Sequence, residues 1–182
     1  RLIGNKGAYA YLSGFLDGGE SFRLKPVTVA ADAAHPKVFA ASEGGFRISA
    51  VPVTHSIIPA LGWRVEKDGC AVVFSSSTSN MGRTLDKIAA DADLLVAHNA
   101  IPEGSTDRVA LKLHMMPSEI GRIAAAAHAK SVVLSHFMNR TENVMQETAA
   151  AIGSRYKGKL NFARDCDIYA VHSGEQIGSC LR

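Results

Sequence analysis

The order of short apolar runs along the chain constrains its fold more than any other feature. In the first half, runs of strand length follow one another, and breakers rich in Gly and Pro separate them. These runs are 25–30, 37–41, 46–53, 62–66 and 71–75. The segment Lys67-Asp68-Gly69 separates the last two, and Asp-Gly accepts the positive φ of a tight turn. The first half is therefore predicted to be rich in β-hairpins.

After Ser79 the pattern changes to alternating helices and strands. Helices are predicted over 82–90, 117–128 and 141–155, and strands over 93–97, 131–135, 160–163 and 168–171. Pro117 suits a first helical turn, and Thr141 is a candidate helix cap. A further helix is predicted over 7–16, and a polar, loosely ordered tail over 173–182. The chain reads as one α/β (α+β) domain over residues 1–182, with helices covering a sheet.

Composition excludes several classes of protein. The chain of 182 residues is 47% hydrophobic and 20% charged, as in ordinary globular proteins. Its net charge is only +3, and the sequence has no run of Lys and Arg, so a nucleic-acid partner is not expected. No apolar stretch approaches the roughly 18 residues that cross a bilayer, so a membrane partner is not expected either.

The cysteines and the first residue bear on the origin of the chain. Cys70, Cys166 and Cys180 are an odd number without CxxC spacing, which favours buried or free thiols over disulfides or a zinc knuckle. We therefore expect a reducing, cytoplasmic location, and leave the periplasm as the alternative. The sequence opens at Arg1 without an initiator Met, as in a processed product, a proteolytic fragment or a truncated chain.

Four of the seven histidines stand where α/β proteins assemble sites. His55, His98 and His136 follow predicted strands, and His114 lies in a loop just before a predicted helix. Neutral imidazole is a favoured zinc ligand, so this placement suits a metal site. The remaining histidines are predicted to be structural or exposed. They are His35, His128 and His172.

An ordered set of motifs resembles the metallo-β-lactamase superfamily, with the ribonuclease Z and phosphodiesterase-like branch nearest in pattern. Its elements are Val51–Arg64 around His55, Val73–Thr78, Asp93–His98, Leu113–Glu119, Val133–His136 and Ala163–Asp165. Together they cover roughly residues 45–171. The resemblance implies the C-terminal half of an αββα sandwich, with mixed sheets and helices on the outer faces.

The resemblance also implies roles for the histidines. His55 would bind one metal and His136 the other, and the shared hydroxide would attack an ester- or phosphodiester-type bond. His114 would act beside the leaving group, as a proton or hydrogen-bond donor. The cofactor implied is zinc, as one or two ions, with Mn or Fe as alternatives. His98 is a further candidate ligand.

The sequence departs from the superfamily pattern at two points. The main ligand block, His-x-His-x-Asp-His, is absent, and it should lie upstream of His55. Ser77 stands where the family keeps the aspartate that bridges two metals, and a hydroxyl is a poorer metal ligand than a carboxylate. The chain is therefore expected to lack the N-terminal metal-binding segment of such a domain.

Two functional hypotheses follow. The first is a metal-dependent hydrolase that acts on a small-molecule or phosphodiester substrate. The second is a non-catalytic module for binding or assembly, whose metal site has decayed at Ser77. RNA processing ranks lower, because the chain has no basic arm. Half of a sandwich would expose an apolar sheet face, so we expect the chain to pair with a missing N-terminal half or with another copy of itself.

Overall fold

The computed structural model describes residues 2–4, 26–30 and 39–180 of the 182-residue chain. The strands are β1 (Leu2–Gly4), β2 (Pro26–Thr28), β3 (Phe39–Glu43), β4 (Phe46–Val53), β5 (Ala60–Lys67), β6 (Cys70–Phe74), β7 (Leu94–His98), β8 (Ser131–Ser135), β9 (Lys159–Phe162), β10 (Asp167–Tyr169) and β11 (Gln176–Ser179). The helices are α2 (Asp86–Ala89), α3 (Ala110–Leu113), α4 (Pro117–Ala126), α5 (Asn139–Glu142) and α6 (Met145–Gly153). The helix predicted over 7–16 and the turn at His35 lie outside the described residues.

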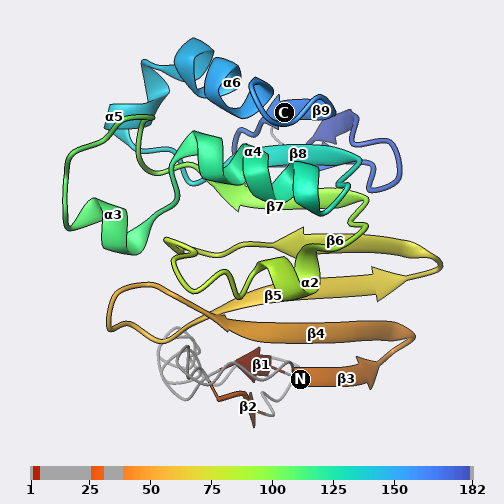
Figure 1. Cartoon of the computed structure of the whole chain (residues 1–182). Helices are drawn as coiled ribbons and strands as arrows, with labels where there is room; N and C mark the ends of the chain where they lie inside the picture. Colours follow the sequence, from red (N-terminus) through yellow and green to blue (C-terminus); the bar gives the residue numbers. More distant parts are fainter. Residues whose placement is uncertain (1, 5–25, 31–38, 181–182) are drawn as a thin grey trace.

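Strands β3 to β9 form one seven-stranded mixed sheet, whose spatial order follows the sequence (Figure 1). Strands β3 to β6 pair antiparallel, and β6 to β9 pair parallel. Between β5 and β6, Asp68 and Gly69 have φ values of 50° and 79° and connect the paired residues Lys67 and Cys70. Two successive positive φ values define a type I′ hairpin turn, so this part of the sequence prediction is confirmed.

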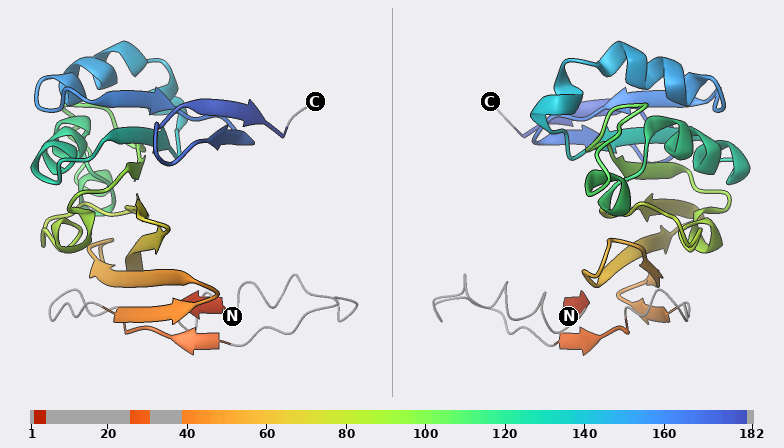
Figure 2. Two further views of the ribbon diagram at one scale, coloured as in Figure 1. Left: turned by 90° about the vertical axis from the view of Figure 1, so that its right-hand side faces the viewer. Right: turned by 60° about the vertical axis from the view of Figure 1, so that its left-hand side comes forward.

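The helices lie on one side of this sheet (Figure 2). Each parallel connection, through α2, through α3 and α4, and through α5 and α6, advances one strand in the same direction. Because such crossovers are right-handed, all of them place their helices on the same face. The main core fills the layer between them, with Ile123 from α4 packed among strand residues such as Leu95 and Leu134. The predicted mixed α/β fold is confirmed.

The opposite face of the sheet is less fully covered within the described residues. Here Val29, Ala50 and Leu61 form a small second core, with Phe39 and Trp63 packed against it. Side chains alternate along a strand. Thus Val73 of β6 is buried among the helices, whereas its neighbour Phe74 is 42% exposed.

The segment predicted as one helix over 141–155 is broken in two. Asn143 and Val144 separate α5 from α6, and both residue types have low helix propensity. Thr141 does not cap a long helix. It lies inside α5, where its Oγ1 accepts a hydrogen bond from the backbone N–H of Met138 at 2.9 Å. The helix predicted over 82–90 is also shorter, since only Asp86–Ala89 is helical.

The end of the chain differs from the loose tail predicted over 173–182. Strand β11 pairs antiparallel with β10, and the hairpin projects from the sheet on the side away from the helices (Figure 2). A disulfide between Cys166 and Cys180 closes this hairpin, so the expectation of free thiols is wrong for these two cysteines and holds for Cys70. An odd number of cysteines is also compatible with one disulfide and one free thiol, so the count alone could not predict this arrangement. None of the described helices combines the length and apolar character needed to cross a bilayer.

Candidate functional site

Loops from several elements meet at the edge of the sheet where the parallel strands end. Strands β4, β6, β7 and β8 run in the same direction, so their carboxyl ends share this edge. His55 and Ser77 follow β4 and β6, His98 ends β7, and His136 follows β8. His114 joins them from the connection between α3 and α4.

The structure brings the four predicted histidines together. Ring centroids lie 5.6 Å apart for His55 and His114, 5.8 Å for His114 and His136, and 4.7 Å for His98 and His136. Two imidazoles bound to one tetrahedral zinc, with nitrogen at about 2 Å, have centroids roughly 5 Å apart. The centroid distances of neighbouring rings are therefore similar to those of imidazoles that bind a metal. Among the described residues, however, no group of three or more His, Cys, Asp or Glu is arranged to hold a metal.

Hydrogen bonds orient two of these rings. The Nδ1 of His55 lies 2.8 Å from the backbone oxygen of Leu113. Because a carbonyl only accepts, this nitrogen carries the proton in that bond and leaves the Nε2 lone pair for a ligand. His98 Nδ1 lies 3.0 Å from Ser77 Oγ. Ser77 therefore holds the ring orientation of His98, as residues that hydrogen-bond the second nitrogen of a metal-binding histidine do.

Two of the histidines are held in the neutral form. Burial, together with the neighbouring His136, His114 and His55, lowers the pKa of His98 to about 4. Burial lowers the pKa of His114 to about 4 as well, assisted by His55 and His136. Both rings are neutral at pH 7, and neutral imidazole is the form that binds metals. The Nδ1 of His114 is buried without a hydrogen-bond partner among the described residues.

The backbone is unusual where the site loops leave the sheet. His136 has φ of 58°, Ser56 has 53° and Ser76 has 54°. Residues with side chains rarely adopt this left-handed conformation, which costs of order 1–3 kcal/mol and concentrates at functional sites. Ser56 follows His55 directly, Ser76 is the second residue after β6, and His136 directly follows β8.

Backbone hydrogen bonds join the site loops to one another. The carbonyl oxygen of Thr54 accepts from the backbone N–H of Ser79 at 2.8 Å and from Thr78 Oγ1 at 2.9 Å. On the other side, the N–H of Ser56 donates to the carbonyl of Lys112 at 2.9 Å. The loop with His55 is thus fixed between the loop of Ser77 and the loop of His114.

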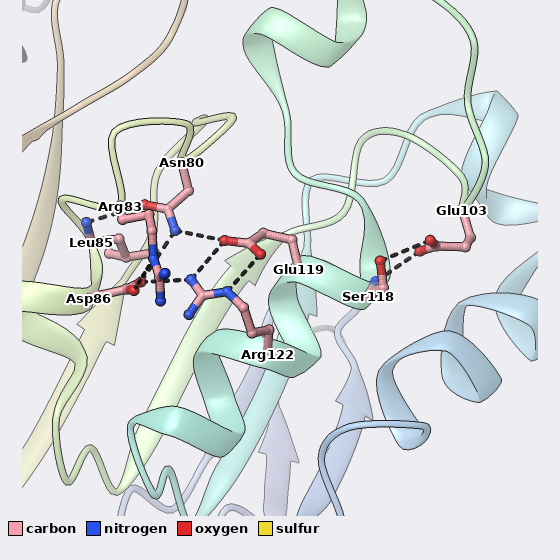
Figure 3. A network of polar contacts seen from close by, with 8 residues as sticks. All are labelled: Asn80, Arg83, Leu85, Asp86, Glu103, Ser118, Glu119 and Arg122. Atoms are coloured by element: carbon pink, nitrogen blue, oxygen red, sulfur yellow. Dashed lines mark hydrogen bonds and ion pairs between the residues drawn. The ribbon is translucent and has the colours of Figure 1, made fainter.

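A network of charged side chains fastens the loop after β6 to helix α4 (Figure 3). Arg122 donates from Nη2 to Asp86 at 2.9 Å and from Nε to Glu119 at 2.8 Å. Asn80 is buried, donates to both carboxylates, and accepts from the backbone N–H of Leu85 at 3.3 Å. The hydrogen bonds that Arg122 donates to Glu119 and Asp86 raise the pKa of Arg122 above its usual value. Burial alone would raise the pKa of Asp86, but Arg122 and Asn80 hold it below its usual value.

The sequence alone does not predict this network. The spacing of Glu119 and Arg122 places them on one helix face, which was a usable signal. Their partners lie more than 30 residues away, and no local pattern predicts such a contact. A smaller contact supports the same helix, because the carboxylate of Glu103 accepts from both the N–H and the hydroxyl of Ser118 at 2.8 Å (Figure 3).

The other described histidines lie outside the cluster, as predicted. The His128 and His172 side chains are 82% and 81% exposed. His128 lies near Asp91, and His172 lies near Asp93. Neither takes part in the ring contacts of the cluster.

Known proteins resemble this chain in sequence. The family model described as a beta-lactamase superfamily domain matches residues 10–137, more than half of the chain. Ribonuclease Z from Mycobacterium tuberculosis (strain H37Rv) is 26% identical over 137 residues, which are 70% of this chain and 50% of that protein. Ribonuclease Z from Mycobacterium bovis (strain BCG / Pasteur 1173P2) has the same identity, with 48% of its length covered. The chain thus spans about half the length of these curated relatives.

Solved structures share the fold at lower identity. The metallo-beta-lactamase fold protein YhfI from Bacillus subtilis superposes with a TM-score of 0.66 and 20% identity, over 89% of this chain and 61% of that one. Human tRNase Z, short form, gives a TM-score of 0.58 and 18% identity, over 90% and 64%. Zn²⁺-bound PqqB from Methylobacterium extorquens gives 0.58 and 17%, over 90% and 62%. The chain belongs to the beta-lactamase superfamily and has the metallo-β-lactamase fold, as its motifs predicted.

Proposed function

We propose that this chain is part of a metal-dependent phosphodiester hydrolase, and that its four-histidine cluster (His55, His98, His114 and His136) contributes to the metal centre. The observation that carries the proposal is the convergence of these rings at the edge where the parallel strands end, with centroids 4.7–5.8 Å apart. The similarity to ribonucleases Z, whose name denotes the cleavage of RNA phosphodiesters, supports the choice of bond.

The donors present fit a divalent metal in type and in pairwise spacing. His55 would hold one ion through Nε2, while His136 and His98 would hold a second. Zinc is the expected ion, with Mn or Fe as alternatives. A bound divalent metal would supply an acidic water and screen negative charge in the transition state. The set is incomplete among the described residues, so the proposal requires further ligands from a missing N-terminal segment or from another copy of the chain.

The reaction would be hydrolysis of one P–O bond. The oxygen of water bonds to phosphorus, the bond to the leaving oxygen breaks, one water proton is released, and the leaving oxygen gains a proton. His114 is neutral at pH 7, with its pKa lowered to about 4 by burial and by its neighbours. In that form it would donate an N–H hydrogen bond to negative charge developing on the leaving oxygen.

Hydrolysis of bis(p-nitrophenyl) phosphate tests the proposal, with zinc or manganese added and with the upstream segment or second copy that completes the ligand set present in the assay. We expect turnover that falls at least about a hundredfold in His136→Ala and in His114→Ala, since such groups contribute about 10² or more. His128→Ala is the matched control, because this exposed histidine lies outside the cluster. Turnover that survives His136→Ala, or absence of turnover with a bound metal, would contradict the proposal.

One observation favours the alternative of a non-catalytic module. Ser77 stands where the superfamily keeps a metal-bridging aspartate, and its hydroxyl is hydrogen-bonded to His98. This position therefore offers no negative charge to hold two cations together. Under this alternative the folded protein binds no metal and cleaves no phosphodiester. Metal analysis of the purified protein in the same experiment separates the two readings.

A further inference from the structure

A groove of about 570 Å³ opens beside His136, outside the ring contacts that define the cluster. It is lined by the end of β8, by the start of α6 and by the loop between β9 and β10. Its volume lies within the range of about 300–1,000 Å³ that is typical of small-molecule sites. Because His136 forms part of the wall, a molecule that reacts at the cluster has room to extend into the groove.

The groove carries three charged side chains that no other described residue neutralises. Arg164, Asp165 and Glu142 all line it, and none makes a side-chain ion pair or hydrogen bond with another described residue. An unpaired guanidinium presents donors suited to a phosphate or carboxylate. Unpaired carboxylates accept from an ammonium group. The three charges sum to −1, so a purely anionic molecule is disfavoured.

The apolar part of the lining is partly fixed in place. Phe137 lines the groove, and its ring stacks on Phe162 with centroids 6.0 Å apart and planes at 21°. Aromatic faces attract ammonium groups by cation–π interaction, worth about 0.5–2 kcal/mol. Met145, 38% exposed, adds a flexible apolar surface.

The loop that carries Arg164 is held before any ligand arrives. The backbone N–H of Arg164 donates to Asp167 Oδ2 at 2.8 Å, and Asp167 also accepts from Tyr169 and Gln176 of the terminal hairpin. The disulfide between Cys166 and Cys180 closes that hairpin directly after the loop. A wall fixed in advance loses less entropy when it binds a ligand.

We infer that the groove beside His136 selects a zwitterionic group, with its phosphate toward His136 and Arg164 and its ammonium toward Glu142 and Asp165. This inference rests on the proposed function for the identity of the anion, because the reacting group there is a phosphodiester. It adds a substrate class: phosphodiesters in which one ester oxygen belongs to an amino alcohol. The groove itself can be tested without turnover.

Binding of O-phosphorylethanolamine to metal-free protein, measured by isothermal titration calorimetry and ligand-observed NMR, tests the groove. Ethyl phosphate lacks the ammonium, and ethanolamine lacks the phosphate. We expect each to bind at least about tenfold more weakly, as the loss of one charged hydrogen bond predicts. Arg164→Gln should weaken O-phosphorylethanolamine about tenfold and leave ethanolamine unchanged, whereas Glu142→Gln should weaken both.

Matched control variants lie on helix α6 or at its end. Arg155→Gln and Glu147→Gln change the same charges on exposed residues outside the groove and should leave binding unchanged. Equal binding of the zwitterion and ethyl phosphate, insensitivity to Arg164→Gln, or no binding at millimolar concentration would overturn the inference. Binding with the expected selectivity but without phosphodiesterase turnover would refute the proposed function and leave the groove standing. Phosphodiesterase turnover without selective binding would refute the inference about the groove and leave the proposed function standing.

Discussion

Two glycines on packed helices should respond to the same substitution with opposite signs. Gly121 lies in α4, where an added Cβ would stand 2.7 Å from the carbonyl oxygen of Ile152 and 3.0 Å from its Cα. Both atoms belong to the backbone of α6, so they cannot turn aside as a flexible side chain would. Carbon contacts are comfortable at about 3.5–4.0 Å, so the helices would have to separate by roughly 0.5–1 Å.

The cost of Gly121→Ala can be worked from two opposing terms. Overpacking of a close contact costs about 1–3 kcal/mol, whereas Ala is favoured over Gly in a helix by about 1 kcal/mol. The two terms leave a net loss of up to about 2 kcal/mol, or up to roughly 4–8 °C in melting temperature for a chain of this size. In Gly153→Ala the added Cβ would meet nothing within 4 Å, so this variant should be unchanged or up to about 1 kcal/mol more stable.

Urea unfolding followed by circular dichroism at 222 nm measures both variants against the parent protein. We expect the free energy of unfolding of Gly121→Ala to lie below that of the parent, and that of Gly153→Ala to lie at or above it. Equal gains in the two variants would show that α4 and α6 do not approach each other as closely as the structure describes. Equal losses of stability would show that the higher helix propensity of Ala does not stabilise Gly153→Ala.

Three further perturbations probe other parts of the account. Burial alone would raise the pKa of Asp93, but Lys130 and a backbone N–H hold it below its usual value; its stabilisation is therefore present above about pH 4 and lost as the pH falls through the lowered pKa. Lys130→Met should move the midpoint of acid unfolding, followed by circular dichroism, to higher pH, and an unmoved midpoint would refute the coupling. Ser77→Asp places a carboxylate beside His98 and should strengthen zinc binding at least about tenfold, whereas weaker binding would show that the hydroxyl is the better partner. Cys166→Ser should expose the terminal hairpin to limited proteolysis while the far-ultraviolet spectrum of the sheet stays unchanged, and a hairpin as resistant as the parent's would contradict its dependence on the disulfide.

The sequence predicted most of the sheet because its strands carry strong local signals. The bounds of β4 and β8 are those predicted, and the Asp68-Gly69 turn is the one its residue types favour. Helix boundaries were weaker. The break at Asn143 and Val144 arises from modest differences in helix propensity. The helical spacing of apolar residues over 141–155 continues through the break and does not indicate it.

The candidate site was predictable to the extent that it depends on strand ends. Four histidines follow strands or precede a helix, and parallel topology gathers those positions at one edge. The hydrogen bond between Ser77 and His98 was not predictable, because the two residues lie 21 positions apart and no local pattern predicts such a contact. The ion pair between Arg122 and Asp86 was not predictable either, because it joins residues 36 positions apart. The disulfide depends on a terminal hairpin, and the polar sequence of the tail did not indicate that hairpin.

Zinc affinity, measured by competition with a chromophoric chelator, tests the central claim that the histidine cluster is a metal site. We expect that the protein binds zinc, that His136→Ala weakens zinc binding at least about tenfold, and that His128→Ala leaves it unchanged. Equal affinity in the three proteins, or no zinc bound by the folded parent protein, would contradict it.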